Sequence, residues 1–66
     1  MLHIQLYRAR RDHARLGHLI DLELRRLRPD ASRLAELKKR KLAARDRIAV
    51  LEARQAEGLT PPPQTA

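Results

Sequence analysis

A proline at position 29 interrupts a sequence that otherwise favours helices over most of its length. Residues 1 to 28 contain no proline, and the strong helix formers Ala, Leu and Arg dominate them. Pro29 disfavours the helical conformation in the residue before it, whereas Asp30 and Ser32 can each accept hydrogen bonds from the free amides of a new helix. We therefore predict a first helix over about residues 3–28 and a turn at residues 29–30.

The second segment has a clear end signal at Gly58. Glycine commonly follows the last residue of a helix, and Pro61, Pro62 and Pro63 beyond it cannot continue one. We predict a second helix over about residues 31–57, followed by an extended, disordered tail over residues 58–66.

Apolar residues recur at steps of three or four along both segments, which places them on one face of each helix. The first stripe comprises Leu6, Ala9, His13, Leu16, Ile20, Leu24 and Leu27, and the second comprises Leu34, Leu37, Lys41, Ala44, Ile48, Leu51 and Gln55. The two stripes predict an all-α, coiled-coil-like antiparallel hairpin of two helices. Its interhelical seam is expected to consist of Leu16, Ile20, Leu24, Leu27, Leu34, Leu37, Lys41, Ala44, Ile48 and Leu51.

A reversal at Pro29 and Asp30 predicts a register in which the numbers of facing residues add up to about 61. This register sets Leu24 opposite Leu37, Ile20 opposite Lys41, and Gly17 opposite Ala44. The charges agree with it, since they predict the ion pairs Arg15–Asp46, Glu23–Lys38, Asp21–Arg25 and Glu36–Arg40. Lys41 in the seam is expected to reach Asp21 and to specify pairing at some cost in stability.

A chain of 66 residues without cysteine is expected to need another protein chain for stability. Below roughly 70 to 80 residues a single core seldom contributes more than about 3 to 5 kcal/mol of net stability. Further apolar residues lie outside the seam and predict a partner surface, formed by Leu19, Leu22, Leu42 and Ala49. The predicted partner is a second copy of the chain or another helical protein.

The charge of the chain, +7, attracts polyanions without identifying one. The densest basic cluster begins the second helix and predicts candidate phosphate contacts at Arg33, Lys38, Lys39, Arg40, Arg45 and Arg47. Tyr7 is the single aromatic residue available for base stacking. Nucleic-acid binding through this surface is therefore expected to be indifferent to sequence and sensitive to salt.

No arrangement of residues in the sequence indicates catalysis, a cofactor or a metal site. The chain has only two glycines and no cysteine nucleophile, and His13 and His18 lie five residues apart, too far round a helix to bind one metal together. No apolar run is long enough to span a bilayer, so integral membrane insertion is not expected. The cysteine-free composition is typical of a cytoplasmic protein.

Residues 28 to 48 carry a resemblance to a known family. Arg28, Pro29 and Asp30 precede a segment in which Leu37, Lys38, Lys41, Leu42, Asp46 and Ile48 match the pattern Leu-Lys-x-x-Lys-Leu-x-Leu-Lys-Asp-x-Ile. This segment resembles the YdcH-like family of small bacterial proteins of unknown function, and the resemblance extends over about residues 10–51. His13, Leu16 and Ile20 fit the family's upstream pattern, whereas Ala44 and Arg45 replace a usual Leu and Lys. The resemblance implies a short helical hairpin without an assigned activity.

Three functional hypotheses remain open at this stage. The leading hypothesis is a structural or adaptor module that self-associates or docks onto partner helices, and the second is nonspecific nucleic-acid binding. The third is attachment to an anionic membrane surface through Leu2, Ile4, Leu6, Tyr7 and the arginines that follow.

Overall fold

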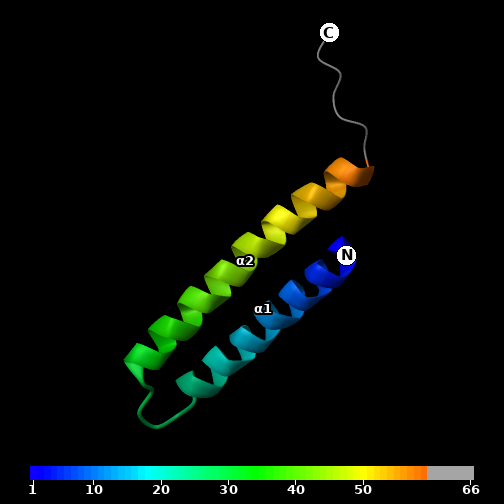
Figure 1. Ribbon diagram of the computed structural model, residues 1–66. Helices are drawn as coiled ribbons and strands as arrows, with labels where there is room; N and C mark the ends of the chain where they lie inside the picture. Colours follow the sequence, from blue (N-terminus) through cyan, green and yellow to red (C-terminus); the bar gives the residue numbers. More distant parts are fainter. Residues whose placement is uncertain (60–66) are drawn as a thin grey trace.

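The computed structural model consists of two antiparallel α-helices joined by a short connection (Figure 1). Helix α1 comprises Leu2–Leu24 and helix α2 comprises Ala31–Leu59, and residues 25–30 reverse the chain between them. The structure describes residues 1–59, with side chains up to residue 57. Within that range the predicted all-α two-helix hairpin is confirmed, while residues 60–66 of the predicted tail lie outside the described residues.

Asp30 caps the start of α2. Its carboxylate oxygen Oδ1 accepts a hydrogen bond from the backbone N–H of Arg33 at 3.1 Å. Its carbonyl oxygen accepts one from the N–H of Leu34 at 2.9 Å. An aspartate at this position satisfies an amide that has no partner inside the helix. Of the two residues that the sequence offered for this role, Asp30 is the one that fulfils it.

Helix α1 ends at Leu24, four residues before the predicted end. In its last turn the N–H of Arg25 bonds to the carbonyl of Asp21, and the N–H of Arg26 bonds to the carbonyl of Glu23, both at 3.2 Å. Pro29 lacks an N–H and disfavours a helical Arg28, so a further turn would have been incomplete. Residues 25–28 instead form part of the reversal between the two helices.

Helix α2 continues two residues beyond its predicted end and includes Gly58. A glycine inside a helix costs only about 1 kcal/mol relative to alanine, which explains how the helix can pass through it.

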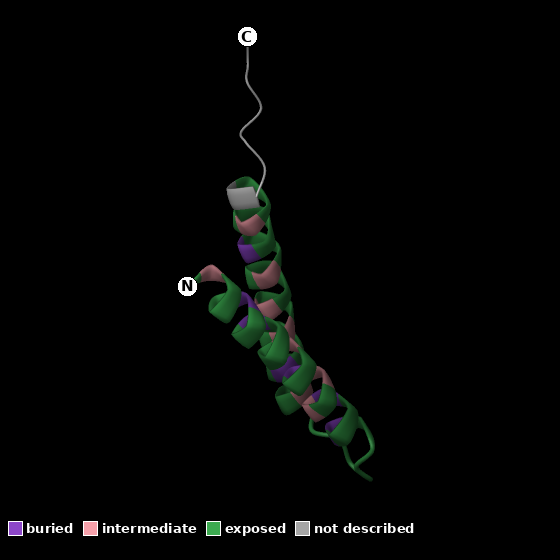
Figure 2. Cartoon of the chain, turned by 90° about the vertical axis from the view of Figure 1, so that its right-hand side faces the viewer, coloured by how far each residue is buried: buried purple, intermediate pink, exposed green. Residues whose placement is uncertain are grey.

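Buried residues lie where the two helices face each other (Figure 2) and form two separate clusters. The first cluster lies near the N-terminus of α1 and contains Leu6, Ala9 and Leu51, with Leu2 and Ile48 packed against it. The second lies nearer the connection and contains Leu16, Ile20 and Leu37, with Leu19, Leu34 and Ala44 packed against it. The hairpin therefore has a core in two parts.

The pairing of the helices differs from the predicted register by about one helical turn. Leu6 shares a cluster with Leu51, Ile20 shares one with Leu37, and Gly17 lies against Lys41, so the numbers of facing residues add up to about 57 instead of about 61. The difference of four residues corresponds to about 6 Å along the helix axis. Its cause is the early end of α1, because a longer reversal moves the pairing position towards the N-terminus of the chain.

The new register corrects three predictions about single leucines. Leu24 and Leu27 were expected in the seam, but Leu24 is 53% exposed and Leu27 is fully exposed in the connection. Leu19 was expected on an outer partner surface, but it is half-buried and packs against the second cluster. The end of the helix and the shifted register together account for all three differences.

Candidate functional site

A buried carboxylate, that of Glu23, occupies the end of the seam where Leu24 and Leu27 were expected. Its side chain is only 2% exposed, and it accepts hydrogen bonds from Arg26 Nη1 at 3.1 and 3.3 Å. Arg33 Nε on α2 lies 3.3 Å from Glu23 Oε1. Glu23 thus links the end of α1 to the start of α2 and does not form the predicted pair with Lys38.

The place of Glu23 in the seam could have been predicted from the sequence, since Glu23 continues the three-and-four spacing of Leu16 and Ile20. An acidic residue at a seam position needs basic partners when it is buried. Arg26 and Arg33 supply them from both sides of the connection.

Lys41 lies in the seam between Leu37 and Ala44 of the second cluster, and its side chain covers Gly17. A Cβ atom built on Gly17 would lie 3.6 Å from Lys41 Nζ and 3.7 Å from Lys41 Cε. Lys41 and His13 are both half-buried. Gly17 therefore faces Lys41 and not Ala44, and the ammonium lies over the glycine instead of taking the predicted position beside Asp21.

This geometry predicts that Gly17→Ala stabilises the hairpin. The added methyl group would make ordinary van der Waals contacts with Lys41, and alanine is favoured over glycine in a helix by about 1 kcal/mol. For a domain of this size, such a gain raises the melting temperature by about 4 to 8 °C. Thermal unfolding followed by circular dichroism measures the change, and a lower melting temperature would show that Lys41 needs the space above the glycine.

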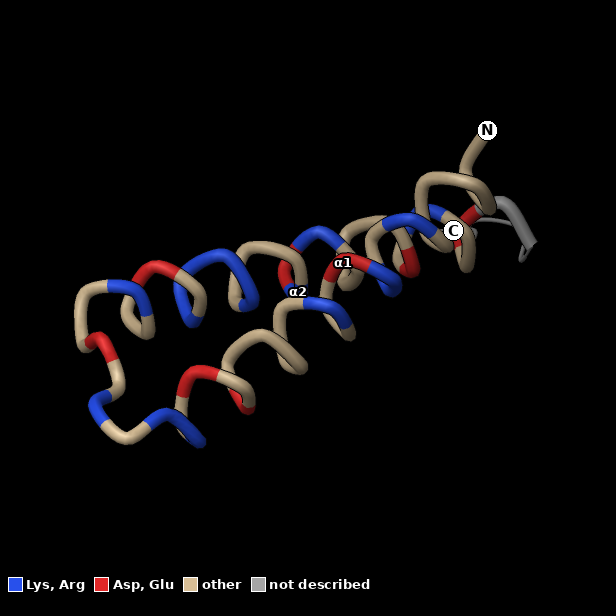
Figure 3. The backbone as a smooth tube through the Cα atoms, turned by 90° about the horizontal axis from the view of Figure 1, so that it is seen from below, with Lys and Arg blue, Asp and Glu red and all other residues tan. Residues whose placement is uncertain are grey.

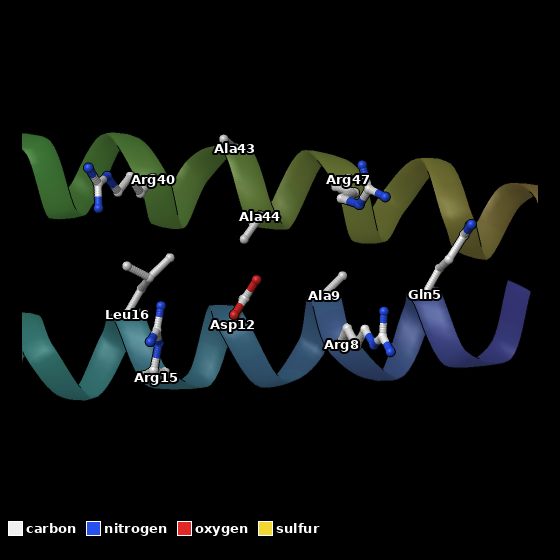
Figure 4. Close-up of a pocket in the computed structure, with 10 residues that line it drawn as sticks. All are labelled: Gln5, Arg8, Ala9, Asp12, Arg15, Leu16, Arg40, Ala43, Ala44 and Arg47. Carbon is white, nitrogen blue, oxygen red and sulfur yellow. The ribbon is translucent and has the colours of Figure 1, made fainter. Parts of the chain in front are cut away.

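Arginines from both helices surround one open groove of about 650 Å³, here called the arginine groove. Arg8 and Arg15 extend from α1, Arg40 and Arg47 extend from α2, and Asp12 lies between the two ends (Figure 4). The walls between these charges are small or apolar, because they are formed by Ala9, Leu16, Ala43 and Ala44. The groove therefore combines a shallow apolar floor with four cationic side chains.

Three of these four arginines have no ion-pair partner among the described side chains. Arg40 donates from Nε to Glu36 Oε1 at 3.1 Å, which confirms one predicted i,i+4 pair. Arg8, Arg15 and Arg47 make no such contact there, and the predicted pair between Arg15 and Asp46 is absent from the same part of the chain. The groove thus retains unneutralised positive charge.

A second groove of about 630 Å³, here called the apolar groove, has a different lining. Its apolar part consists of Ile20, Leu42 and Ile48, and its polar part consists of His13, Lys38, Lys41 and Arg45. Leu42 is 55% exposed and offers an apolar side chain for contact at the edge of this groove. The cations beside it can hold their charges in water while their stems cover apolar surface.

The six predicted phosphate contacts do not all lie on one surface. Arg40 and Arg47 line the arginine groove, whereas Lys38 and Arg45 line the apolar groove. Arg33 pairs with Glu23 and lines a hollow beside Arg15 and Arg40, next to the arginine groove, and Lys39 is exposed. Figure 3 shows that basic and acidic residues are interspersed along both helices.

The phosphate contacts predicted from the sequence did not include Arg8 and Arg15, which line the arginine groove. Their spacing of seven residues is the signal that identifies them, because it repeats between Arg33, Arg40 and Arg47 on α2. Residues seven apart lie on the same face of a helix, two turns from each other.

Of the predicted partner surface, Leu22, Leu42 and Ala49 are exposed. An unpredicted ion pair joins the helices near the N-terminus, where Arg10 Nη2 lies 2.9 Å from Glu52 Oε2. The predicted pair between Asp21 and Arg25 is not formed among the described side chains.

The described part of the chain contains neither a metal-ligand cluster nor a helix suited to spanning a membrane. No three His, Cys, Asp or Glu side chains there lie close enough together to hold a metal ion. Neither described helix combines the length and hydropathy needed to cross a membrane.

Fold and surface together define a small basic hairpin of two helices with a groove on either side. A family model described as "Protein of unknown function (DUF465)" matches residues 6–52, and the chain belongs to this family. The YdcH-like family is the same family, so the resemblance found in the sequence is confirmed. No curated protein and no solved structure matches the chain.

Proposed function

We propose that this protein is a helical interaction module that self-associates or docks onto the helices of another protein, and that it is not an enzyme. The observation that carries the proposal is the balance of exposed and buried apolar residues. The buried ones are Leu6, Ala9, Leu16, Ile20, Leu37 and Leu51. The large exposed ones are more numerous, namely Met1, Ile4, Tyr7, Leu22, Leu24, Leu27, Leu42 and Val50.

The small core of the hairpin is a reason for it to associate with another helix or a second copy. Small domains bury too little apolar surface to gain more than a few kcal/mol of net stability. Each Å² of apolar surface covered by a partner contributes about 25 cal/mol, so contact at an exposed leucine adds to stability directly. Leu42 at the edge of the apolar groove is the residue best placed for such contact. The proposal includes a cytoplasmic setting, as expected from the cysteine-free sequence.

Nonspecific nucleic-acid binding is the second candidate, and the arginine groove favours it. Three unpaired arginines in one groove can contact phosphates. Two observations favour protein partners over nucleic acid: Tyr7 does not line either groove, and the remaining basic residues are divided between opposite surfaces.

Leu42→Lys tests the proposal, and Val50→Lys is its matched control. Both residues lie exposed on α2, at 55% and 52%, but Val50 lines neither groove. Sedimentation at micromolar concentration is expected to show a dimer or larger species for the native protein. Losing the burial of one leucine, about 1.5 to 3 kcal/mol, raises the dissociation constant about ten- to hundredfold in Leu42→Lys.

The control variant should associate like the native protein. Equal weakening in both variants would indicate general charge repulsion instead of a defined surface. A native protein that sediments as a monomer throughout, with its helix signal unchanged, would contradict self-association.

A further inference from the structure

The arginine groove carries its charges in two pairs. Arg8 and Arg15 are seven residues apart on α1, and Arg40 and Arg47 are seven apart on α2. Seven residues of α-helix extend over about 10.5 Å. In Figure 4, Arg15 and Arg40 lie towards one end of the groove and Arg8 and Arg47 towards the other. Each end of the groove therefore presents one arginine from each helix.

The part of the arginine groove between these two ends can accommodate a helix. Ala9 on α1 and Ala44 on α2 project into the space between the helices, as does Leu16, whereas Ala43 lies at the far edge of α2 (Figure 4). Small residues allow a third backbone to approach closely, and their methyl groups offer apolar contact along its side. A guanidinium pairs well with a carboxylate because it can donate two parallel hydrogen bonds.

We infer that the arginine groove binds an acidic helix of another protein, whose carboxylates lie seven residues apart. Such a helix places both carboxylates on one face, about 10.5 Å from each other, which is also the separation of the arginine pairs. The residues between the carboxylates rest on the alanines. This inference rests on the proposed function, since it names a partner for a helix-binding protein.

A second copy of the chain does not fit this description. The acidic residues of α1 are Asp12, Asp21 and Glu23, and those of α2 are Glu36, Asp46, Glu52 and Glu57. No two of them on one helix are seven residues apart. The chain also carries a net charge of +7, which opposes docking of its own basic surface into a basic groove.

Asp12 distinguishes the acidic helix from a nucleic acid. It lies between the two arginine pairs, where a continuous phosphate backbone would bring negative charge against it (Figure 4). A helix with carboxylates seven apart leaves that position free for a polar or basic side chain. The groove also contains no aromatic side chain on which a base could stack.

Peptide binding tests the inference. The probe is a synthetic alanine-rich helical peptide of about 20 residues, long enough to be helical in water, with two glutamates seven apart. A control peptide has the same composition with the glutamates nine apart, on opposite faces of the helix. The matched peptide is expected to bind more tightly than the control peptide when both are titrated and followed by fluorescence anisotropy.

Two double variants test whether the matched peptide binds in the arginine groove. Arg8→Gln with Arg47→Gln removes one arginine pair and is expected to weaken binding of the matched peptide about tenfold or more. Arg11→Gln with Arg28→Gln removes the same charge from exposed residues that line neither groove, and should leave binding unchanged. Circular dichroism checks that both variants remain helical.

Three results would overturn the inference: equal affinity for both peptides, equal loss in both double variants, or a single-stranded oligonucleotide that outcompetes the matched peptide through Arg8 and Arg47. The last result would assign the groove to nucleic acid. The Leu42→Lys variant separates the two proposals, because it should still bind the peptide. If Leu42→Lys weakens self-association but the native protein does not bind the matched peptide, only the inference about the arginine groove is wrong.

Discussion

Ile20→Ala is expected to remove most of the helical structure, whereas Leu24→Ala should change stability little. Ile20 is buried in the second cluster, and replacing a buried isoleucine or leucine by alanine costs about 2 to 5 kcal/mol. A core of this size contributes only about 3 to 5 kcal/mol in total. Leu24 is half exposed and lies outside both clusters, so its truncation leaves no cavity.

Urea and thermal unfolding of the two variants measure the difference. The pair of substitutions also distinguishes the two registers, since Leu24 faces Leu37 in the register predicted from sequence and Ile20 shares a cluster with Leu37 in the structure. Equal destabilisation by both substitutions would favour the predicted register over the observed one.

Lys41→Leu is expected to raise stability by about 1 to 2 kcal/mol and the melting temperature by roughly 5 to 15 °C. Lys41 is half-buried and lies one helical turn from both Leu37 and Ala44 of the second cluster, so a leucine there would extend that cluster. The substitution removes a polar seam residue as well, and such residues fix register or oligomeric state at a cost in stability. We therefore expect a broader distribution of oligomers together with the higher melting temperature.

Lys39→Leu is the control for this prediction, because Lys39 is exposed and belongs to the same basic run. It should leave the melting temperature nearly unchanged. Sedimentation and thermal unfolding, carried out side by side, measure both properties. A lower melting temperature for Lys41→Leu with an unchanged oligomeric state would contradict a role for Lys41 in specifying the pairing.

The helical class, the antiparallel arrangement and a helix start capped by Asp30 or Ser32 could be predicted from local signals. Periodicity identifies a helix face, and Pro29 with Asp30 identifies a restart. The register could not be predicted in this way, because it depends on where α1 ends. A shift of four residues preserves the apolar face of each helix, so the stripe pattern fits both registers about equally well.

The charge pairs show the same ambiguity. Glu23 has a basic residue opposite it in the predicted register, Lys38, and another in the observed register, Arg33. A chain so rich in Arg and Lys offers oppositely charged neighbours in many alignments, and exposed ion pairs contribute too little to choose between them. The arginine groove needed the structure for a related reason, since half of its cations come from each helix.

The division of the core into two clusters implies that the hairpin opens in stages. The half near the connection is held by Leu16, Ile20 and Leu37 and is closed by the buried carboxylate of Glu23. The half near the N-terminus has a smaller cluster and an ion pair between Arg10 and Glu52 that is exposed to solvent. Local opening follows the lowest density of buried contacts, so backbone amides of α1 before His13 should exchange with solvent sooner than those after it. In the partly opened molecule the C-terminal half of α2 stands as a free amphipathic helix with Ile48 and Leu51 uncovered, ready to exchange one helical neighbour for another.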